Sequence, residues 1–461
     1  MKLTLVYAPA SYLDMPTLGM ACLQGYLKER GHETIGVWDA NLDFFHFLMD
    51  PSYLRRCLVR ARAWGVIEKP ELAVLEAMLE DSTPLLSVMN DPERYYQASE
   101  YNRAFLSAQR ALGLLNHFEP DLEYSIHPSA FAVRFKDRQR AFSAENVVTH
   151  VLEGEMDHFS RFLIEQHPRM KECATSDVLG FSCANPDQIL GTLHMARAFR
   201  ESGYRGNIIV GGSFITRARE AWKTEPRLFD LVDALAVFEG EETLHEYLEH
   251  VQGKHPISEV PNLIYREGTT IRTTPVRKIR DLTPMPTPDF TGYALDRYLT
   301  PEPVLPIYAS RGCYHDVCSF CNHHENYFGG YRARPPRAVH ADMLAYKGRY
   351  GCSKFFFVDE ITSPKYQKDL CKLTEGEGFR WYVHCRVDAS VSEEDFSAMA
   401  RGGVTLLHVG VESSSTRTLA MMDKGYHHED VVDFLERLAK VPLTTHLNTI
   451  RGFPGESPED Y

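Results

Sequence analysis

Short apolar segments alternate with segments of helical periodicity along most of the chain, and this alternation restricts the possible folds more than any other feature. In the first part, strands are predicted at residues 2–7, 34–38, 177–183, 207–210 and 234–238, and helices at residues 18–29, 188–201 and 241–251. Strands connected by helical crossovers form a parallel sheet with helices on both faces. The sequence therefore predicts that residues 1–280 form an α/β domain with a doubly wound, flavodoxin-like sheet.

One long segment interrupts this alternation. Residues 42–176 are rich in charged residues and have helical periodicity, for example at residues 71–79 and 95–115. We interpret this segment as a helical insertion that serves either as a lid or as a purely structural cap. Residues 262–265 and 270–274 are predicted to pair as strands, and three prolines within residues 281–300 predict a linker.

The alternation resumes after the linker, in residues 301–461. Strands are predicted at residues 304–309, 354–358, 381–387, 405–410 and 445–450, and helices at residues 338–349, 366–373, 393–400 and 429–439. Repeated strand–helix units with polar residues after the strands predict a barrel whose loops carry the chemistry. Ser392 with Asp395, and Ser457 with Asp460, have the spacing of capping boxes at two helix starts.

Three cysteines lie in one loop directly after the first strand of this second domain. Cys313, Cys318 and Cys321 stand five and three positions apart, and three thiolates in one loop indicate a metal centre. Three cysteines on a 4Fe-4S cluster leave one iron open to bind another molecule. Zinc would need a fourth protein ligand, for which three nearby histidines are candidates: His315, His323 and His324. The spacing alone leaves both alternatives open.

Charge and composition argue against several classes of function. The 461 residues carry a net charge of -13, so bulk electrostatics do not attract a nucleic acid. No apolar stretch approaches the roughly 18 residues of a membrane helix, and residues 1–7 have the pattern of a strand rather than of a signal peptide. The ten cysteines are too few and too scattered for a disulfide framework. We expect a cytoplasmic protein that binds neither nucleic acid nor membrane.

The ligand site of a doubly wound sheet lies beyond the C-terminal ends of its strands, where the strand order reverses. Residues 9–16, 182–186, 211–214 and 239–241 are expected there, and none of them contains the G-x-G-x-x-G loop of a dinucleotide site. Residues 182–184, followed after 26 residues by Gly211 and Gly212, resemble the S-x-L and G-G elements of cobalamin-binding domains. Two glycines let a bulky flat ligand approach the backbone. Residues 8–19 contain no histidine that could serve as a lower cobalt ligand, and a sheet without a ligand is the alternative.

Taken together, the motifs resemble those of radical S-adenosylmethionine (SAM) enzymes with an N-terminal cobalamin-binding domain. The matching stretches are residues 15–19, 240–243, 310–313, 356–360, 410–413 and 452–456. The usual cluster spacing is C-x3-C-x2-C, and here one additional residue separates Cys313 from Cys318. The resemblance implies an enzyme similar to the class B radical SAM methyltransferases, with a 4Fe-4S cluster, SAM and cobalamin as cofactors.

The resemblance also implies roles for individual residues. Cys313, Cys318 and Cys321 would hold the cluster. The residues implied in SAM binding are Phe320 near the adenine, Asp359 and Glu360 at the methionine amino group, Arg386 at the carboxylate, and Glu412 and Ser413 at the ribose. The residues implied in cobalamin binding are Tyr12, Leu13, Ser182, Cys183, Gly211, Gly212, Ser213, Glu239 and Gly240. The remaining polar residues of the strands, His384, His408 and His446, are interpreted as wall residues rather than ligands.

The reaction implied by the resemblance is methylation of an unactivated carbon of a peptide or small natural product. One electron from the cluster splits SAM, the 5′-deoxyadenosyl radical removes a hydrogen, and the substrate radical takes a methyl group from methylcobalamin. An electron donor such as flavodoxin or ferredoxin is an implied partner. The alternatives are a radical SAM enzyme that carries out a rearrangement or cyclisation, a zinc-binding interaction module, and a cobalamin sensor.

The resembled barrel has six strand–helix units. Only five strands are predicted here, and Tyr461 follows shortly after a helix start at Ser457. A missing sixth strand would leave an open sheet edge that is prone to association. We therefore expect a partial barrel that is truncated after its fifth strand.

Overall fold

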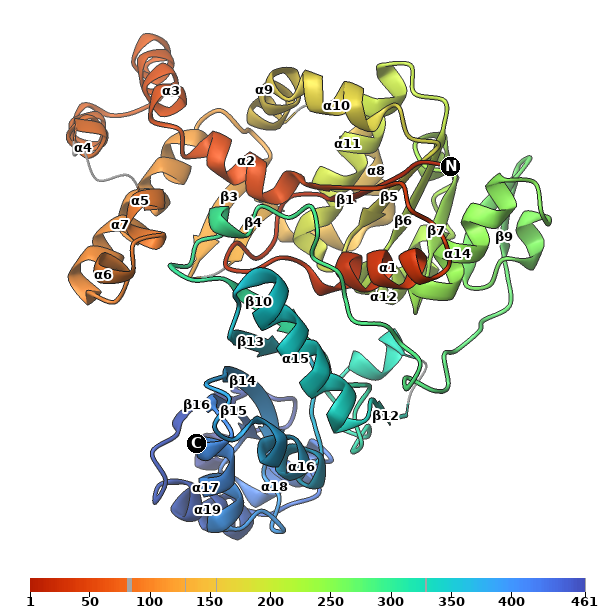
Figure 1. The fold of residues 1–461 in the computed structure, drawn as a ribbon. Coiled ribbons are helices and arrows are strands. Elements are labelled where there is room, and N and C mark those ends of the chain that lie inside the picture. The colour runs from red at the N-terminus through yellow and green to blue at the C-terminus, as the bar shows by residue number, and fades with distance from the viewer. Residues whose placement is uncertain (81–84, 129, 155, 328–329, 461) are drawn as a thin grey trace. The chain divides into compact units, whose positions relative to one another are not determined.

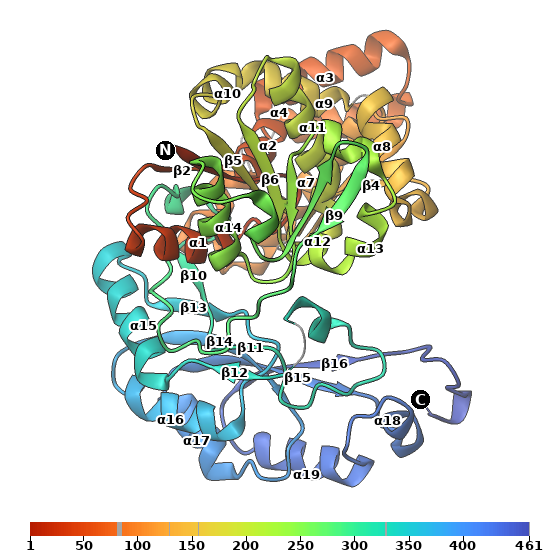
Figure 2. The ribbon, with the colours of Figure 1, turned by 90° about the vertical axis from the view of Figure 1, so that its right-hand side faces the viewer.

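The chain folds into two compact α/β units (Figure 1, Figure 2). The computed structural model describes residues 1–80, 85–128, 130–154, 156–327 and 330–460. The first unit contains Met1–Arg277 and Pro288–Glu302, and the second contains Lys278–Thr287 and Pro303–Tyr461. The residues predicted as a linker are thus divided between the units. Among the described residues, no helix is both long enough and apolar enough to span a membrane.

The first unit is built on a seven-stranded sheet. Five strands are parallel in the order β2-β1-β5-β6-β7, as the alternation predicts: β1 (Leu3–Tyr7), β2 (Ile35–Asp39), β5 (Val178–Ser182), β6 (Asn207–Gly211) and β7 (Ala234–Ala236). The hairpin of β8 (Leu263–Glu267) and β9 (Thr270–Thr273) extends this sheet in antiparallel pairing, so the sheet is mixed. The strand order reverses between β1 and β5.

Helices cover both faces of this sheet. In β1, Leu3 and Leu5 pack in one core with α1 (Leu18–Glu29) and α14 (Gly240–Val251). Val6 belongs to a second core that includes residues of α11 (Ile189–Glu201). The two-residue period of the strand sends these side chains to opposite faces, which agrees with the predicted doubly wound arrangement.

The long insertion is not wholly helical, and that part of the prediction was wrong. Its helices are α2 (Ala40–Leu48), α3 (Pro51–Trp64), α4 (Lys69–Glu80), α5 (Leu85–Met89), α6 (Pro92–Tyr95), α7 (Ala98–Asn116), α8 (Ala144–Glu153), α9 (Asp157–Glu165) and α10 (His167–Cys173). Between α7 and α8, β3 (Leu122–His127) and β4 (Ala130–Phe135) form an antiparallel hairpin. Every second residue of β3 is buried, beginning at Leu122.

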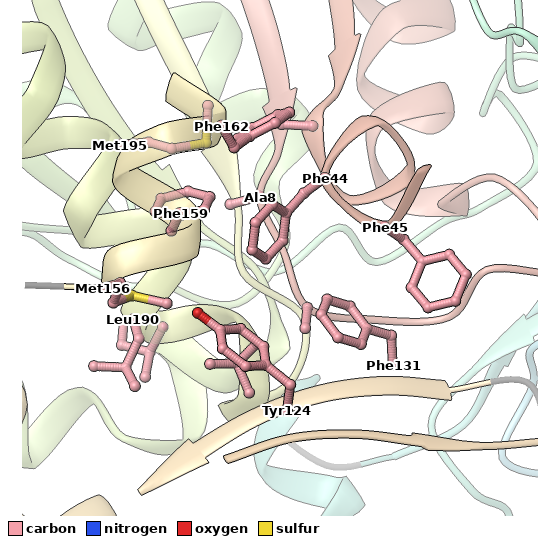
Figure 3. Close-up of a cluster of buried hydrophobic side chains, with 14 of the residues drawn as sticks. Ala8, Phe44, Phe45, Tyr124, Phe131, Met156, Phe159, Phe162, Leu190 and Met195 are labelled. Atoms are coloured by element: carbon pink, nitrogen blue, oxygen red, sulfur yellow. The ribbon is translucent and has the colours of Figure 1, made fainter. Parts of the chain in front are cut away.

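The insertion shares one hydrophobic core with the sheet (Figure 3). Phe44 of α2 lies with its ring centroid 5.0 Å from that of Phe159 and 5.9 Å from that of Phe131. The same cluster contains Ala8, at the end of β1. Because the aromatic side chains of the insertion pack directly against the sheet, the insertion is part of the first unit.

The second unit contains a sheet of five parallel strands in the order β10-β13-β14-β15-β16. The strands are β10 (Val304–Ile307), β13 (Lys354–Phe357), β14 (Arg380–Arg386), β15 (Val404–Glu412) and β16 (Thr444–Thr449). Its helices are α15 (Pro336–Tyr350), α16 (Pro364–Thr374), α17 (Glu393–Arg401), α18 (Thr416–Met421) and α19 (His428–Leu438). Figure 2 shows α15, α16, α17 and α19 along one side of the sheet. The capping box of Ser392 and Asp395 is confirmed at the start of α17.

Candidate active site

The cysteine loop, described over residues 312–327 and 330–331, lies beyond the C-terminal end of β10, at the edge where a barrel-type fold carries its chemistry. It is closed at its base by β11 (Ser310–Arg311) and β12 (Arg332–Ala333), which pair antiparallel. Gly312 has a φ of 83°, and a Cβ atom at this position would overlap the carbonyl oxygen of Gly330. Only glycine therefore allows the two ends of the loop to approach this closely.

The three cysteines of the loop are free and partly exposed, as is Cys385, whereas the cysteines at positions 22, 57, 173, 183, 352 and 371 are buried. The Cys321 amide donates to the Cys318 carbonyl oxygen at 3.1 Å. Partial burial raises the pKa of the Cys318 and Cys321 thiols, and the nearby Lys424 ammonium opposes this rise. Partial exposure together with a nearby cation is the environment expected of thiols that act as metal ligands.

Two of the three histidines in this loop are engaged with other groups of the chain. His315 Nε2 lies 2.7 Å from the Asp423 carbonyl oxygen, and His323 Nδ1 lies 3.3 Å from Glu360 Oε1; the side chain of His324 is outside the described residues. Within the described part of the chain, no three side chains of His, Cys, Asp or Glu converge as ligands of a single ion. The thiolates of a 4Fe-4S cluster bind different irons and need not converge on one point. Three cysteines in one loop are the number that holds a 4Fe-4S cluster with one open iron.

The two acidic residues after β13 have different environments. Asp359 is 1% exposed. Its carboxylate accepts hydrogen bonds from the Ala309 amide at 3.0 Å and from the Ser310 hydroxyl at 2.5 Å, as well as from the Ser310 amide. Burial raises the pKa of Asp359 to about 7. Asp359 thus connects the end of β13 to β11, and Glu360, whose side chain is 16% exposed, is the better placed of the two for a ligand ammonium.

Arg386 ends β14 with one donor unused. Its guanidinium lies over the Tyr426 ring, 5.4 Å from the centroid, and its Nη2 donates to the Lys424 carbonyl oxygen. Its Nε is buried and has no hydrogen-bond partner among the described residues. Because an unsatisfied buried donor is costly, this N–H suits a carboxylate supplied by a ligand.

Lys424 connects the end of β15 with the cysteine loop. Its Nζ lies 3.4 Å from Glu412 Oε1, and both side chains are nearly buried. It also lies 5.8 Å from the ring centroid of Phe320, which is 40% exposed. Glu412 has a φ of 67° at a bulge in β15, a conformation that costs a non-glycine residue on the order of 1 kcal/mol or more. Because its carboxylate is paired, Glu412 is less available to a ribose than the sequence suggests.

The other predicted ribose contact is also engaged within the chain. Ser413 is 6% exposed, and its hydroxyl oxygen accepts a hydrogen bond from the Ser415 amide at 3.1 Å. Sequence reasoning did not identify Lys424 or Tyr426. Both lie in an irregular turn after α18, and their only sequence signal is the glycine between them, at position 425.

In the first unit, the residues predicted to bind cobalamin differ in accessibility. Ser182, Gly211, Gly212, Ser213 and Gly240 are half-buried near the C-terminal ends of the strands, and Tyr12 is 53% exposed. Leu13, Cys183 and Glu239 are buried, so their side chains do not face a ligand in this conformation. A Cβ atom at Gly212 would overlap the Cys183 backbone. Chain packing therefore requires this glycine even without a ligand.

The β3–β4 hairpin covers part of the predicted crevice. The Phe131 amide donates to the Ser11 carbonyl oxygen at 3.1 Å, and Arg134 forms two hydrogen bonds to Asp187 at 2.5 and 2.7 Å. These contacts tie the hairpin to the loops after β1 and β5, where the strand order reverses. A ligand at this edge is thus directed toward the ends of β5 and β6, near Ser182 and Gly211.

Residues 307–461 match the family model described as the radical SAM superfamily. An uncharacterized methyltransferase of Pyrococcus horikoshii is 26% identical over 259 residues, which are 55% of this chain and 55% of that protein. Bacteriochlorophyllide d C-12(1)-methyltransferase of Chlorobaculum tepidum is 29% identical over 193 residues, or 40% of this chain and 41% of that protein. The chain thus spans about half the length of the curated relatives it matches.

Solved structures of two enzymes share the fold. The methyltransferase TsrM from Kitasatospora setae, with cobalamin and a 4Fe-4S cluster bound, matches 100% of this chain and 71% of its own, with a TM-score of 0.58 and 13% identity. The cobalamin-dependent SAM radical enzyme OxsB, with aqua-cobalamin bound, matches 62% of this chain and 42% of its own, with a TM-score of 0.53 and 19% identity. Residues 307–461 are therefore a radical SAM domain, and the chain shares its fold with TsrM and OxsB.

Proposed function

We propose that this chain is a cobalamin-dependent radical SAM enzyme that methylates an unactivated carbon of a peptide or small natural product. The observation that carries the proposal is the loop of Cys313, Cys318 and Cys321 at the strand ends of a radical SAM domain. Two curated relatives are named methyltransferases, and TsrM and OxsB were solved with cobalamin. A radical SAM enzyme that carries out a rearrangement or cyclisation is the alternative within the same chemistry.

The side chains of the second unit fit the cluster and SAM. The three cysteines hold the cluster, Arg386 Nε donates to the methionine carboxylate, and Glu360 accepts from the methionine ammonium. Lys424 places a positive charge beside the thiolates and the exposed ring of Phe320. When bound, the cofactors supply one-electron cleavage of SAM and a methyl group for the substrate carbon. The electron comes from a small donor such as flavodoxin or ferredoxin.

Cobalamin would contact the half-buried rim of the first unit. Ser182, Gly211, Ser213 and Gly240 present small side chains or none at this rim, which suits a large ligand with a nearby backbone. Residues 8–19 contain no histidine, so this loop cannot supply an imidazole to cobalt. The exposed Tyr12 is the largest side chain among the predicted cobalamin contacts.

Anaerobic reconstitution with iron, sulfide and hydroxocobalamin tests the proposal. The wild-type chain should acquire a 4Fe-4S absorbance, retain cobalamin after desalting, and produce 5′-deoxyadenosine when it is reduced in the presence of SAM. Cys313→Ala, Cys318→Ala and Cys321→Ala should each abolish 5′-deoxyadenosine, because each removes a cluster ligand. Cys22→Ala, which removes a buried thiol from the first unit, should leave the product unchanged.

Three outcomes contradict the proposal. Production of 5′-deoxyadenosine after loss of the cysteines would overturn the cluster assignment. Zinc bound in proportion to the three thiols, without SAM cleavage, would indicate an interaction module. Retention of cobalamin without any SAM cleavage, in wild-type and cysteine variants alike, would indicate a sensor.

A further inference from the structure

The loops after β1 and β5 meet where the strand order of the first sheet reverses, and polar contacts join them directly. Ser11, in the loop after β1, is 2% exposed. Its hydroxyl oxygen accepts a hydrogen bond from Asn185 Nδ2 at 2.9 Å and lies 2.6 Å from the Tyr7 hydroxyl oxygen. The Ala10 amide donates to the Asp187 carbonyl oxygen at 3.2 Å. The crevice expected at this reversal is therefore bridged by the chain itself.

A second buried side chain, that of Gln188, joins the same two loops. Its Nε2 donates to the Ala8 carbonyl oxygen at 2.7 Å, and its Oε1 accepts from the Ala184 amide at 2.8 Å. Gln188 and Ala8 are both fully buried, and Ala8 belongs to the core that the sheet shares with the insertion. The amide group of Gln188 thus holds the backbones of the two loops together inside the protein.

The β3–β4 hairpin lies over these joined loops. Ala130, the first residue of β4, forms an antiparallel bridge with Tyr12 of the loop after β1. Arg134, further along β4, holds Asp187 of the loop after β5. The hairpin is attached to both loops. A group that entered between them would therefore displace the hairpin as well as the contacts beneath it.

The loops after β5 and β6 are joined in the same way. The Cys183 amide donates to the Gly211 carbonyl oxygen at 2.7 Å, and the Ser213 hydroxyl donates to the Ala184 carbonyl oxygen at 2.6 Å. The three loops therefore form one hydrogen-bonded surface at the C-terminal ends of the strands. We call this surface the closed rim, and it consists of residues 8–13, 183–188 and 211–213.

The two parts of cobalamin place different demands on such a surface. The corrin ring is broad and flat, so it can rest on the small half-buried residues at the strand ends, such as Ser182 and Ser213. The nucleotide tail ends in a bicyclic aromatic base, which needs an opening between the loops to become buried. Such an opening would break the buried hydrogen bonds of Ser11 and Gln188, and broken hydrogen bonds at buried groups are costly.

We propose that the closed rim takes the corrin ring and leaves the nucleotide tail outside the sheet, so that this site binds corrinoids with and without the tail alike. This inference rests on the proposed cobalamin-dependent function and names the ligand class of its corrinoid site. A tail buried in the sheet would add the burial of an aromatic base to the affinity, whereas a tail left in water adds little.

Methylcobalamin and methylcobinamide test the inference, because they carry the same corrin ring and methyl group and only the first has the nucleotide tail. Their Kd values are measured by anaerobic equilibrium dialysis, in the dark, against the reconstituted full chain. We expect the two values to differ by less than about tenfold, since burial of the base would lower the Kd of methylcobalamin by at least that factor. A Kd for methylcobalamin that is lower by about tenfold or more overturns the inference.

A pair of arginine variants tests whether the hairpin opens to admit the tail. Arg134→Ala removes the hydrogen bonds to Asp187, and Arg138→Ala, the control, removes an exposed ion pair with Glu123 of the same hairpin. We expect both variants to keep the wild-type Kd for both corrinoids, because the side chains of Ser11 and Gln188 still join the loops beneath the hairpin. Tighter binding of methylcobalamin alone in Arg134→Ala would show that the tail enters there, and it would overturn the inference.

The outcomes separate this inference from the proposed function. A strong preference for methylcobalamin overturns the closed rim, while retention of cobalamin and cysteine-dependent SAM cleavage leave the proposed function standing. If neither corrinoid binds and SAM cleavage persists, cobalamin is removed from the proposed function and the corrinoid site is overturned with it.

Discussion

Individual residues at the strand ends were predicted by type but not by orientation. Asp359 and Glu360 are adjacent in sequence, and the motif gives both carboxylates the same role. The fold buries Asp359 against the amides of residues 309 and 310 and leaves Glu360 half-buried. Similarly, Glu412 is paired with Lys424 from a turn 12 residues away. Local sequence cannot reveal such partners, because they depend on how separate loops meet.

Buried histidines make the stability of the first unit dependent on pH, and His194 is the clearest case. His194 is 7% exposed, its Nε2 has no partner among the described residues, and burial lowers its pKa from 6.5 to about 3. Between these pH values the unfolded chain binds a proton at this position that the folded chain does not. The contribution of neutral His194 to the free energy of unfolding is therefore present above pH 6.5 and falls by about 1.4 kcal/mol per unit as the pH decreases.

His194→Leu should remove this dependence. Denaturant unfolding followed by circular dichroism gives the free energy of unfolding of both proteins at pH 7 and pH 5. Between pH 7 and pH 5, this free energy should fall further for the wild type than for the variant. His167→Gln, at an exposed position at the start of α10, serves as the control. A difference that stays constant with pH would contradict the assignment of a neutral buried imidazole.

At the scale of elements, the alternation of strand and helix predicted both sheets. It failed at the β3–β4 hairpin, although Leu122, Tyr124 and Ile126 alternate in the way typical of a half-buried strand. The helical periodicity of the surrounding residues concealed this short signal. The hairpin matters for the predicted crevice, because its Arg134 binds Asp187, the residue that follows the predicted crevice segment 182–186. To find short strands within a largely helical segment, the sequence must be searched separately for a two-residue period.

The contact between α11 and the loop after β1 makes Gly191 irreplaceable. A Cβ atom at this position would overlap the Pro9 carbonyl oxygen, so Gly191→Ala should lower the free energy of unfolding by about 2–3 kcal/mol through overpacking. Gly113 lies within α7, where an added Cβ atom would meet no heavy atom within 4 Å. Gly113→Ala should therefore stabilise the chain by up to about 1 kcal/mol. Equal effects of the two substitutions in thermal unfolding would contradict this close approach.

At the scale of the whole molecule, the proline-containing segment between the units is more ordered than its composition suggests. The Asp289 amide donates to the Ala21 carbonyl oxygen at 2.9 Å, and the Asp289 carboxylate accepts from Lys28 Nζ at 2.6 Å. On the other side of the boundary, Thr287 Oγ1 donates to Asp342 Oδ1 at 2.5 Å. Prolines and polar residues predict a linker from local propensity alone. This segment is instead held in place by hydrogen bonds to residues more than 50 positions away in the sequence.

Loss of the Asp289 contacts should release residues 288–302 from the first unit. Asp289→Ala removes the ion pair with Lys28, in which the Asp289 side chain is 12% exposed, and should cost about 1–3 kcal/mol. Limited proteolysis should then cleave faster within residues 288–302. Lys440→Ala, which removes the exposed pair with Glu393, should leave the cleavage rate unchanged. Cleavage at the wild-type rate in Asp289→Ala would show that these contacts do not hold the segment.

The base of the cysteine loop is fixed by the β11–β12 pair and by Gly312, independently of what lies between them. A residue can therefore be added inside the loop without displacing the strands on which it stands. For this reason the spacing between Cys313 and Cys318 can be longer by one residue while the spacing between Cys318 and Cys321 and the supporting sheet stay the same. The scaffold tolerates variation in the length of the ligand-bearing segment, but not the replacement of the glycine that closes it.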